Sequence, residues 1–221
     1  MKKTLVKQGF DKCNIVSFGN MFLIANGRVG YRGTLEEFDK SQMVGLNVLG
    51  FYDKYQDKWR ESINLPNPIF FIPSYNNEEC KVQNITPLHH YVELDIYHAL
   101  MSRYSEYDNL IISSERFLSS VNKNILVHKY VLKAKSDGTY QIDFNVDVDM
   151  YEINGPHYQS KQLLYEQGTF IFTGLTNEGM MVRTYTRYVS DEEIKINENR
   201  CFIKKELHQD DEICIFTYSY F

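Results

Sequence analysis

Residues 140–150 carry the pattern that most constrains the fold of this chain. Every second position is hydrophobic and the positions between hold Gln, Asp or Asn; the hydrophobic positions are Tyr140, Ile142, Phe144, Val146, Val148 and Met150. A strict period of two places alternate side chains on opposite faces of a β-strand, so one face is buried and the other contacts water. The segment therefore predicts a strand in a two-faced sheet.

The rest of the chain repeats such runs with turn signals between them. Asp-Gly, Asn-Gly and other short polar connections are typical of β-hairpins. They predict hairpins that pair 109–119 with 124–134, 126–135 with 140–150, 169–175 with 180–189 and 201–207 with 212–221, and one more within 21–32 around Asn26-Gly27. Short strands at this spacing indicate an antiparallel sandwich.

Two kinds of segment interrupt the strand pattern. Pro66, Pro68 and Pro73 predict a loop around residues 64–74 that leads into an edge strand, because proline cannot donate to a ladder. The best candidates for short helices are residues 34–40 and 190–196. No longer helical stripe is present in the sequence.

Composition points to the same fold class. The 221 residues include only three alanines, against 17 Tyr and 14 Phe. Alanine is the strongest helix former, whereas aromatic residues favour strands. The length allows a large hydrophobic core, and no linker or low-complexity segment divides the chain. We therefore expect residues 1–221 to form a single all-β domain, a large antiparallel β-sandwich with few short helices.

Several classes of protein are excluded at this point. The net charge of −5 does not supply the positive charge that nucleic-acid binding requires. The longest apolar run, residues 21–25, is far shorter than the ~18 residues of a membrane helix. Polar residues stand where a signal peptide would need its apolar core, and the four cysteines form no CxxC pair. We expect a cytoplasmic protein with reduced thiols, no membrane contact and no nucleic-acid partner.

No catalytic or metal motif stands out. The chain lacks GxSxG, HExxH, a phosphate loop and GxGxxG after a strand. His89 and His90 are neighbours, and neighbouring strand residues point to opposite faces, so they cannot share one metal ion. Asp147 and Asp149 share a face at a spacing that suits an inverting glycosidase, but other polar residues share that face too. A solvated sheet surface explains both carboxylates, so no metal is expected.

Six segments in a fixed order resemble the opening of glycoside hydrolase family 65, which includes maltose, trehalose and kojibiose phosphorylases. They are FLIANGRVGYRGTLEE (22–37), VGLNVLGFYDKY (44–55), NLPNP (64–68), LDIYHALMSRY (94–104), ISSERFLSS (112–120) and INGPHY (153–158). Each segment alone is weakly specific. Their shared order makes the resemblance fairly specific.

The resemblance implies a non-catalytic β-sandwich of the large kind called a supersandwich, which precedes a catalytic (α/α)6 barrel in the full enzymes. The general-acid glutamate and the phosphate-binding loop belong to that barrel, so no catalytic residue is assigned to this chain. No cofactor is expected; inorganic phosphate would be a co-substrate of the parent enzyme, where it replaces the activated water of an inverting hydrolysis. The parent enzyme would act on an α-linked glucosyl disaccharide and form a homodimer.

The matching segments supply five candidate site residues: Arg32, Tyr52, Asn64, Asn67 and His157. Polar groups beside aromatic rings suit the recognition of an oligosaccharide, so these residues are candidates for bordering the sugar cleft or facing the barrel. In the alternative interpretation, Arg32 and Asn67 form hydrogen bonds with backbone groups of loops, and Tyr52 packs in the sheet.

The sequence departs from the family pattern at several positions. Ala25 stands where glycine is usual, Arg28 where tyrosine is usual, Pro68-Ile69 where an aromatic residue usually continues after Asn67, and Tyr158 where tryptophan is usual. These differences indicate a divergent branch. Two other functions stay open: a freestanding carbohydrate-binding module with an aromatic-lined groove, and a structural subunit for dimerisation. A domain that docks on a barrel should instead expose apolar surface.

Overall fold

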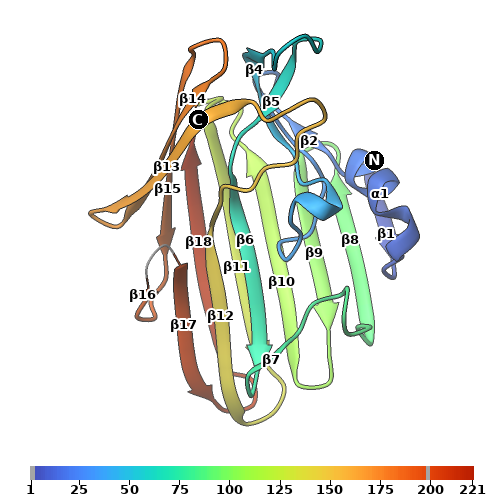
Figure 1. The fold of residues 1–221 in the computed structure, drawn as a ribbon. Helices are drawn as coiled ribbons and strands as arrows, with labels where there is room; N and C mark the ends of the chain where they lie inside the picture. The colour runs from blue at the N-terminus through green and yellow to red at the C-terminus, as the bar shows by residue number, and fades with distance from the viewer. Residues whose placement is uncertain (1–2, 198–199) are drawn as a thin grey trace.

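The computed structural model describes residues 3–197 and 200–221, which form three antiparallel sheets and a few short helical turns (Figure 1). The nine-stranded sheet has the order β1 (Thr4–Gln8), β8 (His89–Asp95), β9 (Leu100–Glu106), β10 (Leu110–Leu118), β11 (Ile125–Ala134), β18 (Glu212–Tyr220), β15 (Met181–Val189), β14 (Thr169–Thr176) and β13 (Tyr158–Glu166). The five-stranded sheet has the order β16 (Lys195–Asn197), β17 (Arg200–Leu207), β12 (Gly138–Asp147), β6 (Asn67–Tyr75) and β7 (Glu78–Glu79). The four-stranded sheet consists of β2 (Ile24–Ala25), β3 (Val29–Tyr31), β4 (Leu46–Asp53) and β5 (Glu61–Asn64).

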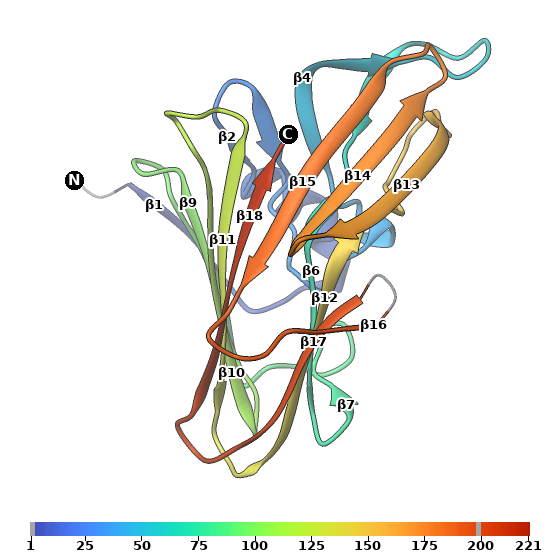
Figure 2. The same cartoon turned by 90° about the vertical axis from the view of Figure 1, so that its left-hand side faces the viewer.

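The two larger sheets face each other as the layers of a sandwich (Figure 2). Aromatic rings from both layers fill the space between them: the ring centroid of Phe71 lies 4.8 Å from that of Tyr130 and 5.3 Å from that of Phe144. Phe144 in turn lies 4.9 Å from Tyr188. Such pairs add to the stabilisation that burial of the rings already provides. The all-β sandwich predicted from the alternating pattern is confirmed. Of the strand predicted at residues 140–150, residues 140–147 belong to β12, and residues 148–150 lie in the connection that follows it.

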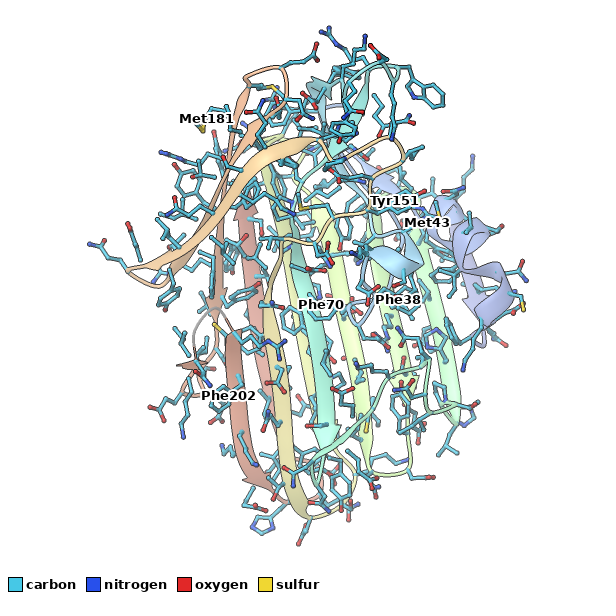
Figure 3. All side chains as sticks on the ribbon, in the orientation of Figure 1. Phe38, Met43, Phe70, Tyr151, Met181 and Phe202 are labelled. Atoms are coloured by element: carbon cyan, nitrogen blue, oxygen red, sulfur yellow. The ribbon has the colours of Figure 1, made fainter. Side chains whose placement is uncertain are left out.

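The four-stranded sheet lies at one end of the sandwich, uppermost in Figures 1 and 2. The helix α1 (Ile15–Met21) and the 3-10 turns η1 (Lys12–Asn14) and η2 (Lys40–Gln42) accompany it. The connection from β12 to β13 passes the same end, where Figure 3 shows Tyr151 beside Met43. No helix within residues 3–197 and 200–221 is long and apolar enough to cross a membrane.

Three of the predicted hairpins are confirmed: β10 pairs with β11, β14 with β15, and β2 with β3. The other two are wrong. β11 and β12 follow each other in sequence but lie in opposite layers, and the same holds for β17 and β18. An alternating pattern shows that one face of a strand is buried, but both layers bury a face against the same core. The pattern therefore cannot show which strand is the hydrogen-bonded partner.

The predicted loop at residues 64–74 is also wrong, because most of it is the strand β6. This strand pairs with β12 along one edge, while β7 pairs only with Ser74 and Tyr75 on the other. Pro68 and Pro73 are tolerated because much of that second edge has no ladder partner. Neither of the two predicted short helices forms: residues 34–40 are turns that enter η2, and residues 190–196 lead into β16.

Candidate functional site

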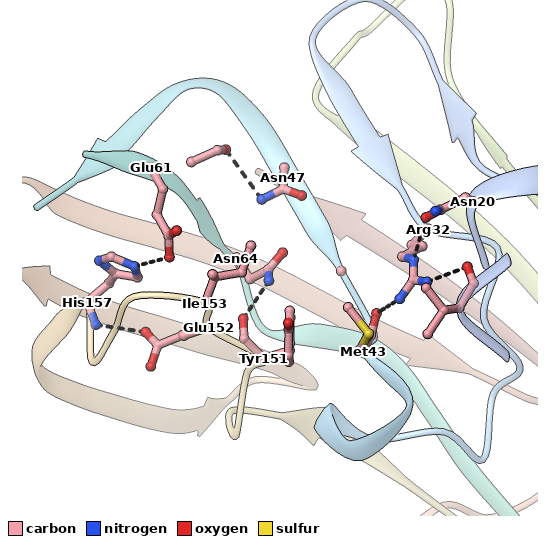
Figure 4. A pocket seen from close by; sticks show the side chains of 13 residues that line it. Asn20, Arg32, Met43, Asn47, Glu61, Asn64, Tyr151, Glu152, Ile153 and His157 are labelled. Atoms are coloured by element: carbon pink, nitrogen blue, oxygen red, sulfur yellow. Dashed lines mark hydrogen bonds and ion pairs between the residues drawn. The ribbon is translucent and has the colours of Figure 1, made fainter. Parts of the chain in front are cut away.

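A cavity of about 350 Å³ opens at the end of the molecule that carries the four-stranded sheet (Figure 4). We call it the end pocket. Its wall comes from α1, the connection that contains η2, strands β4 and β5, and the connection from β12 to β13. The lining residues are Val16, Asn20, Arg32, Met43, Gly45, Asn47, Glu61, Ser62, Asn64, Tyr151, Glu152, Ile153 and His157. Three of the five predicted site residues therefore meet in one cavity.

Arg32 joins two parts of the pocket wall. Its Nη2 donates to the carbonyl oxygen of Val16 at 2.7 Å, and its Nη1 donates to that of Met43 at 2.6 Å. Its Nε donates to Oδ1 of Asn20 at 3.1 Å. The guanidinium lies so close to Gly19 that a Cβ there would come within 2.9 Å of it. All three nitrogens have protein partners, so Arg32 fixes α1 against the loop after η2.

Asn64 holds the opposite wall. Its Nδ2 donates to the carbonyl oxygen of Tyr151 at 2.6 Å, which ties β5 to the connection from β12 to β13. Its Oδ1 is buried and has no hydrogen-bond partner within the described part of the chain. A buried polar atom without a partner calls for an explanation, and other buried polar atoms of the described residues, such as Nδ2 of Asn67, share this feature. Beside it, Nδ2 of Asn47 donates to the carbonyl oxygen of Ile63 at 2.9 Å.

His157 lies between two carboxylates and its side chain is 1% exposed. Nδ1 is 3.1 Å from Oδ2 of Asp53, and Nε2 is 2.6 Å from Oε1 of Glu61. The backbone N–H of His157 donates to Oε1 of Glu152 at 2.8 Å. We call these four residues the His157 network. Both ring nitrogens are engaged, so the ring cannot accept a proton from a substrate in this arrangement.

Both carboxylates that face the ring are held in the charged form. Burial opposes the charge on Asp53, but hydrogen bonds from the Glu178 N–H, Asn177 and His157 outweigh burial and lower its pKa. Burial likewise opposes the charge on Glu61, and donors from Asn154 and His157 lower its pKa. Hydrogen bonds to the ionised form are the cause in each case.

The two remaining predicted site residues lie elsewhere. Tyr52 is 45% exposed and borders a neighbouring shallow depression of about 290 Å³ on β2, β3, β4 and β5, which shares Asn47 and Ser62 with the end pocket. Asn67 is buried, and its Oδ1 accepts from the hydroxyl of Tyr31 at 2.7 Å and from the Ile69 N–H at 3.1 Å. For Asn67, these contacts match the interpretation in which it satisfies buried backbone.

A buried ionic cluster between the sheets escaped the sequence analysis. The side chain of Arg103 is 1% exposed, and it donates to Glu36 and Glu37 at 2.8 Å each. Arg116 donates to the carbonyl oxygen of Thr34 and lies over the ring of Tyr31 at 4.7 Å. These contacts hold the connection from β3 to η2 against the nine-stranded sheet. This connection contains Arg32 and leads through η2 to Met43, whose carbonyl oxygen Arg32 binds.

The electrostatics of this cluster are strongly coupled. Burial opposes the charge on Glu36, but the ring of His128, whose Nε2 lies 3.5 Å from Oε1, and the charges of Arg103 and Arg116 hold its pKa well below the usual range. Burial also lowers the pKa of His128, in opposition to Glu36. Both arginines occupy buried positions, in β9 and β10 respectively.

Comparison with known proteins decides the family. Residues 5–218 match the family description "Glycosyl hydrolase family 65, N-terminal domain". The chain belongs to this family. Its resemblance to family 65, first seen in six short segments, is therefore confirmed.

The family 65 relatives are phosphorylases. The domain is 33% identical over 225 residues to nigerose phosphorylase of Lachnoclostridium phytofermentans, and the match covers 98% of this chain. It is 26% identical over 191 residues to 1,2-alpha-glucosylglycerol phosphorylase of Bacillus selenitireducens, which covers 81% of this chain. A solved structure from the human microbiome that carries the name of kojibiose phosphorylase shares the fold, with a TM-score of 0.80 at 15% identity over 98% of the chain.

The family 65 domain spans only part of these proteins. It covers 28% of the nigerose phosphorylase, 23% of the glucosylglycerol phosphorylase and 32% of the solved structure. Most of each relative therefore lies outside the matched region.

Proposed function

We propose that this chain is the non-catalytic N-terminal domain of a phosphorylase that acts on an α-linked glucosyl disaccharide. In this proposal the end pocket borders the sugar cleft and faces an (α/α)6 barrel that carries the catalytic groups, with inorganic phosphate as co-substrate. The observation that carries it is the convergence of Arg32, Asn64 and His157, from three separate segments, on one cavity. The names of the relatives support the reaction class.

The contacts in the end pocket favour a shaping role over a catalytic one. Arg32 uses its three nitrogens on protein oxygens, and His157 uses both ring nitrogens on carboxylates. A general base must be within reach of a substrate proton and free to accept it. Neither residue is free in that sense, whereas the buried Oδ1 of Asn64 lacks a partner among the described residues.

Exposed apolar side chains at the same end of the molecule support docking on another domain. Leu49, Trp59, Ile153 and Met181 are between 61% and 68% exposed. All four belong to elements or connections that lie uppermost in Figure 1. Large exposed apolar groups that gather at one end are typical of an interaction surface. The same observation disfavours the freestanding carbohydrate-binding module as the second candidate.

The proposal has three further parts, two about the parent enzyme and one about this chain. We propose that it is a homodimer and that it is cytoplasmic. The four cysteines of the chain are free, as expected in a reducing compartment. We also propose that residues 1–221 act as one domain, since the core is continuous across the two layers.

A chimera tests this proposal. The chain replaces the corresponding segment of the nigerose phosphorylase, and phosphorolysis of nigerose is followed by release of glucose 1-phosphate. We expect an active chimera in which Asn64→Ala lowers kcat/KM at least tenfold. Tyr52→Ala, a control outside the pocket, should leave kcat/KM unchanged. Equal effects of the two variants would refute the role of the end pocket.

The chain alone tests the second candidate. Nuclear magnetic resonance titration of the chain with nigerose, maltose and kojibiose should show no saturable binding at millimolar concentrations. Saturable binding localised around Trp59 and Tyr55 would favour a freestanding carbohydrate-binding module instead.

A further inference from the structure

Strand β13 is the longest of the six edge strands in the three sheets. It spans nine residues, whereas the other five edge strands span between two and five residues each. Figure 2 shows β13 as the outermost strand on the side of the nine-stranded sheet opposite β1. All of its residues except Tyr158 and Leu163 are exposed, so both faces of the strand and its outer edge contact water.

The backbone groups along this outer edge follow a fixed alternation. Residues 167 and 168 form a two-residue turn in which both φ angles are positive, at 48° and 82°, so Glu166 and Thr169 form the hydrogen-bonded pair that closes the hairpin. Hydrogen-bonded and non-hydrogen-bonded pairs alternate along an antiparallel ladder. The residues whose N–H and C=O groups point away from β14 are therefore Lys161, Leu163 and Tyr165.

Strand β13 lacks the devices that protect an exposed sheet edge from other strands. Such edges carry proline or a projecting lysine, or they lie beneath another segment. The strand contains no proline, and its one lysine is held in place, because Nζ of Lys161 donates to the carbonyl oxygen of Val148 at 3.0 Å. The other charged residue, Glu166, stands at the end beside the turn. The middle of the edge is therefore accessible to another strand.

The length of the edge favours a second copy of β13 as its partner. A strand as short as the other edge strands would leave part of it unpaired. The regular ladder of β13 begins at Ser160, after a bulge, and ends at Glu166, before the turn. Two antiparallel copies of this segment pair along their full length only when Leu163 lies opposite Leu163. A twofold axis perpendicular to the sheet then relates the copies and keeps the inner faces of both sheets on the same side.

The side chains and the backbone groups agree with this register. Lys161 lies opposite Tyr165, which places a cation beside an aromatic ring, and Ser160 lies opposite Glu166, which places a hydroxyl donor beside a carboxylate. No like charges face each other. The residues whose backbone groups point outward also lie opposite one another, so each of these pairs can exchange two hydrogen bonds.

We propose that two copies of this chain pair antiparallel along β13, with Leu163 opposite Leu163, so that their nine-stranded sheets become one continuous sheet. The contact uses the same surface on both copies, so it closes after two and leaves no β13 edge for a third copy. It supplies a surface for the homodimer in the proposed function and in that respect rests on it. The pairing itself is a property of this chain.

Analytical ultracentrifugation of the 221-residue chain between about 5 and 200 µM tests the pairing. We expect a monomer–dimer equilibrium for the wild type. Leu163→Pro removes an outward N–H that β14 does not use, so it should keep the native circular dichroism spectrum and weaken the dimer at least tenfold. Leu163→Val keeps this N–H and should dimerise like the wild type. A wild type that stays monomeric throughout, or equal affinities of the two variants, would overturn the proposal.

A pair of cysteine variants tests the register without proline. In a chain that carries Cys13→Ser to remove the exposed thiol, Leu163→Cys places two Cα atoms about 5.5 Å apart across the axis, which a disulfide can span. Leu164→Cys places them about 8 Å apart, which it cannot span. We expect mild oxidation to link the first variant into dimers and to leave the second unlinked.

Two outcomes of the oxidation would contradict the proposal: no linked dimer from Leu163→Cys, or equal linkage of both variants. None of these measurements involves catalysis. An inactive chimera would therefore sink the proposed function and leave the pairing standing, whereas a monomeric chain would sink the pairing and leave the proposed role of the end pocket standing.

Discussion

Replacement of Arg103 by methionine tests whether the buried ionic cluster holds the sandwich together. The guanidinium donates to Glu36 and Glu37 at 2.8 Å each and, through Nε, to Oγ of Ser105 at 2.8 Å. Methionine fills most of the same volume but leaves the buried carboxylate of Glu37 without its ion-pair partner and that of Glu36 with only the more remote charge of Arg116. Removal of one partner from a buried ion pair costs about 3–5 kcal/mol of the free energy of unfolding.

The expected loss is large enough to measure easily. For a chain of this size it corresponds to a fall in Tm of about 6–20 °C. Urea unfolding at pH 7, followed by circular dichroism, gives the free energy directly. Lys133→Met is the control, because it removes an exposed pair with Asp210 and should unfold like wild type. A second variant that adds Glu37→Gln should regain part of the loss. If Arg103→Met lost less than about 1 kcal/mol, the cluster would not be an ion pair that supports the fold.

Three further predictions use the same unfolding assay. Gly33→Ala places a Cβ 2.4 Å from that of Phe22 and should cost about 3 kcal/mol, whereas Gly30→Ala meets nothing within 4 Å and should be nearly neutral; equal costs would contradict the packing. Asp53→Asn should cost about 2 kcal/mol at pH 7. The pKa of Asp53 is lowered, so this stabilisation is fully present above the carboxyl's ordinary pKa and is lost progressively as pH falls from there through the lowered pKa of the folded state; a difference between wild type and variant that does not shrink between pH 7 and pH 3 would refute it. Asn67→Ala should cost about 1–3 kcal/mol and leave the KM of the chimera unchanged, because its contacts are buried; a changed KM would place it at the sugar cleft.

The sequence was sufficient for most strands within residues 109–150, 169–189 and 201–221, but not for all of their partners, and it did not predict β1, β4, β5, β8, β9 or β13. The alternation at residues 140–150 predicts β12 because its polar and apolar positions are strictly separated. It does not show that β12 pairs with β6 and β17, because burial of one face is the same in either layer. The three prolines predicted a loop where the strand β6 forms. Prolines are tolerated in β6 because much of its second edge has no ladder partner, and only the three-dimensional arrangement shows this.

The candidate site was predictable only where its residues lie in the segments that resemble the family. Arg32, Asn64 and His157 were found through the family segments, and they meet in the end pocket. Glu61 was not, because nothing in the local sequence shows that it faces an imidazole 96 positions away. Arg103 was not found either, because the apolar residues around it stand on both faces of the strand, Leu100 and Tyr104 on one and Met101 on the other.

The most direct test of the central claim measures glucose 1-phosphate. The claim is that this chain shapes a site and that the bond is broken by groups on another domain. The 221-residue chain is incubated with phosphate and either maltose or nigerose, beside the chimera that contains the rest of the nigerose phosphorylase. We expect glucose 1-phosphate from the chimera with nigerose and none from the chain alone. Turnover by the chain alone would contradict the claim.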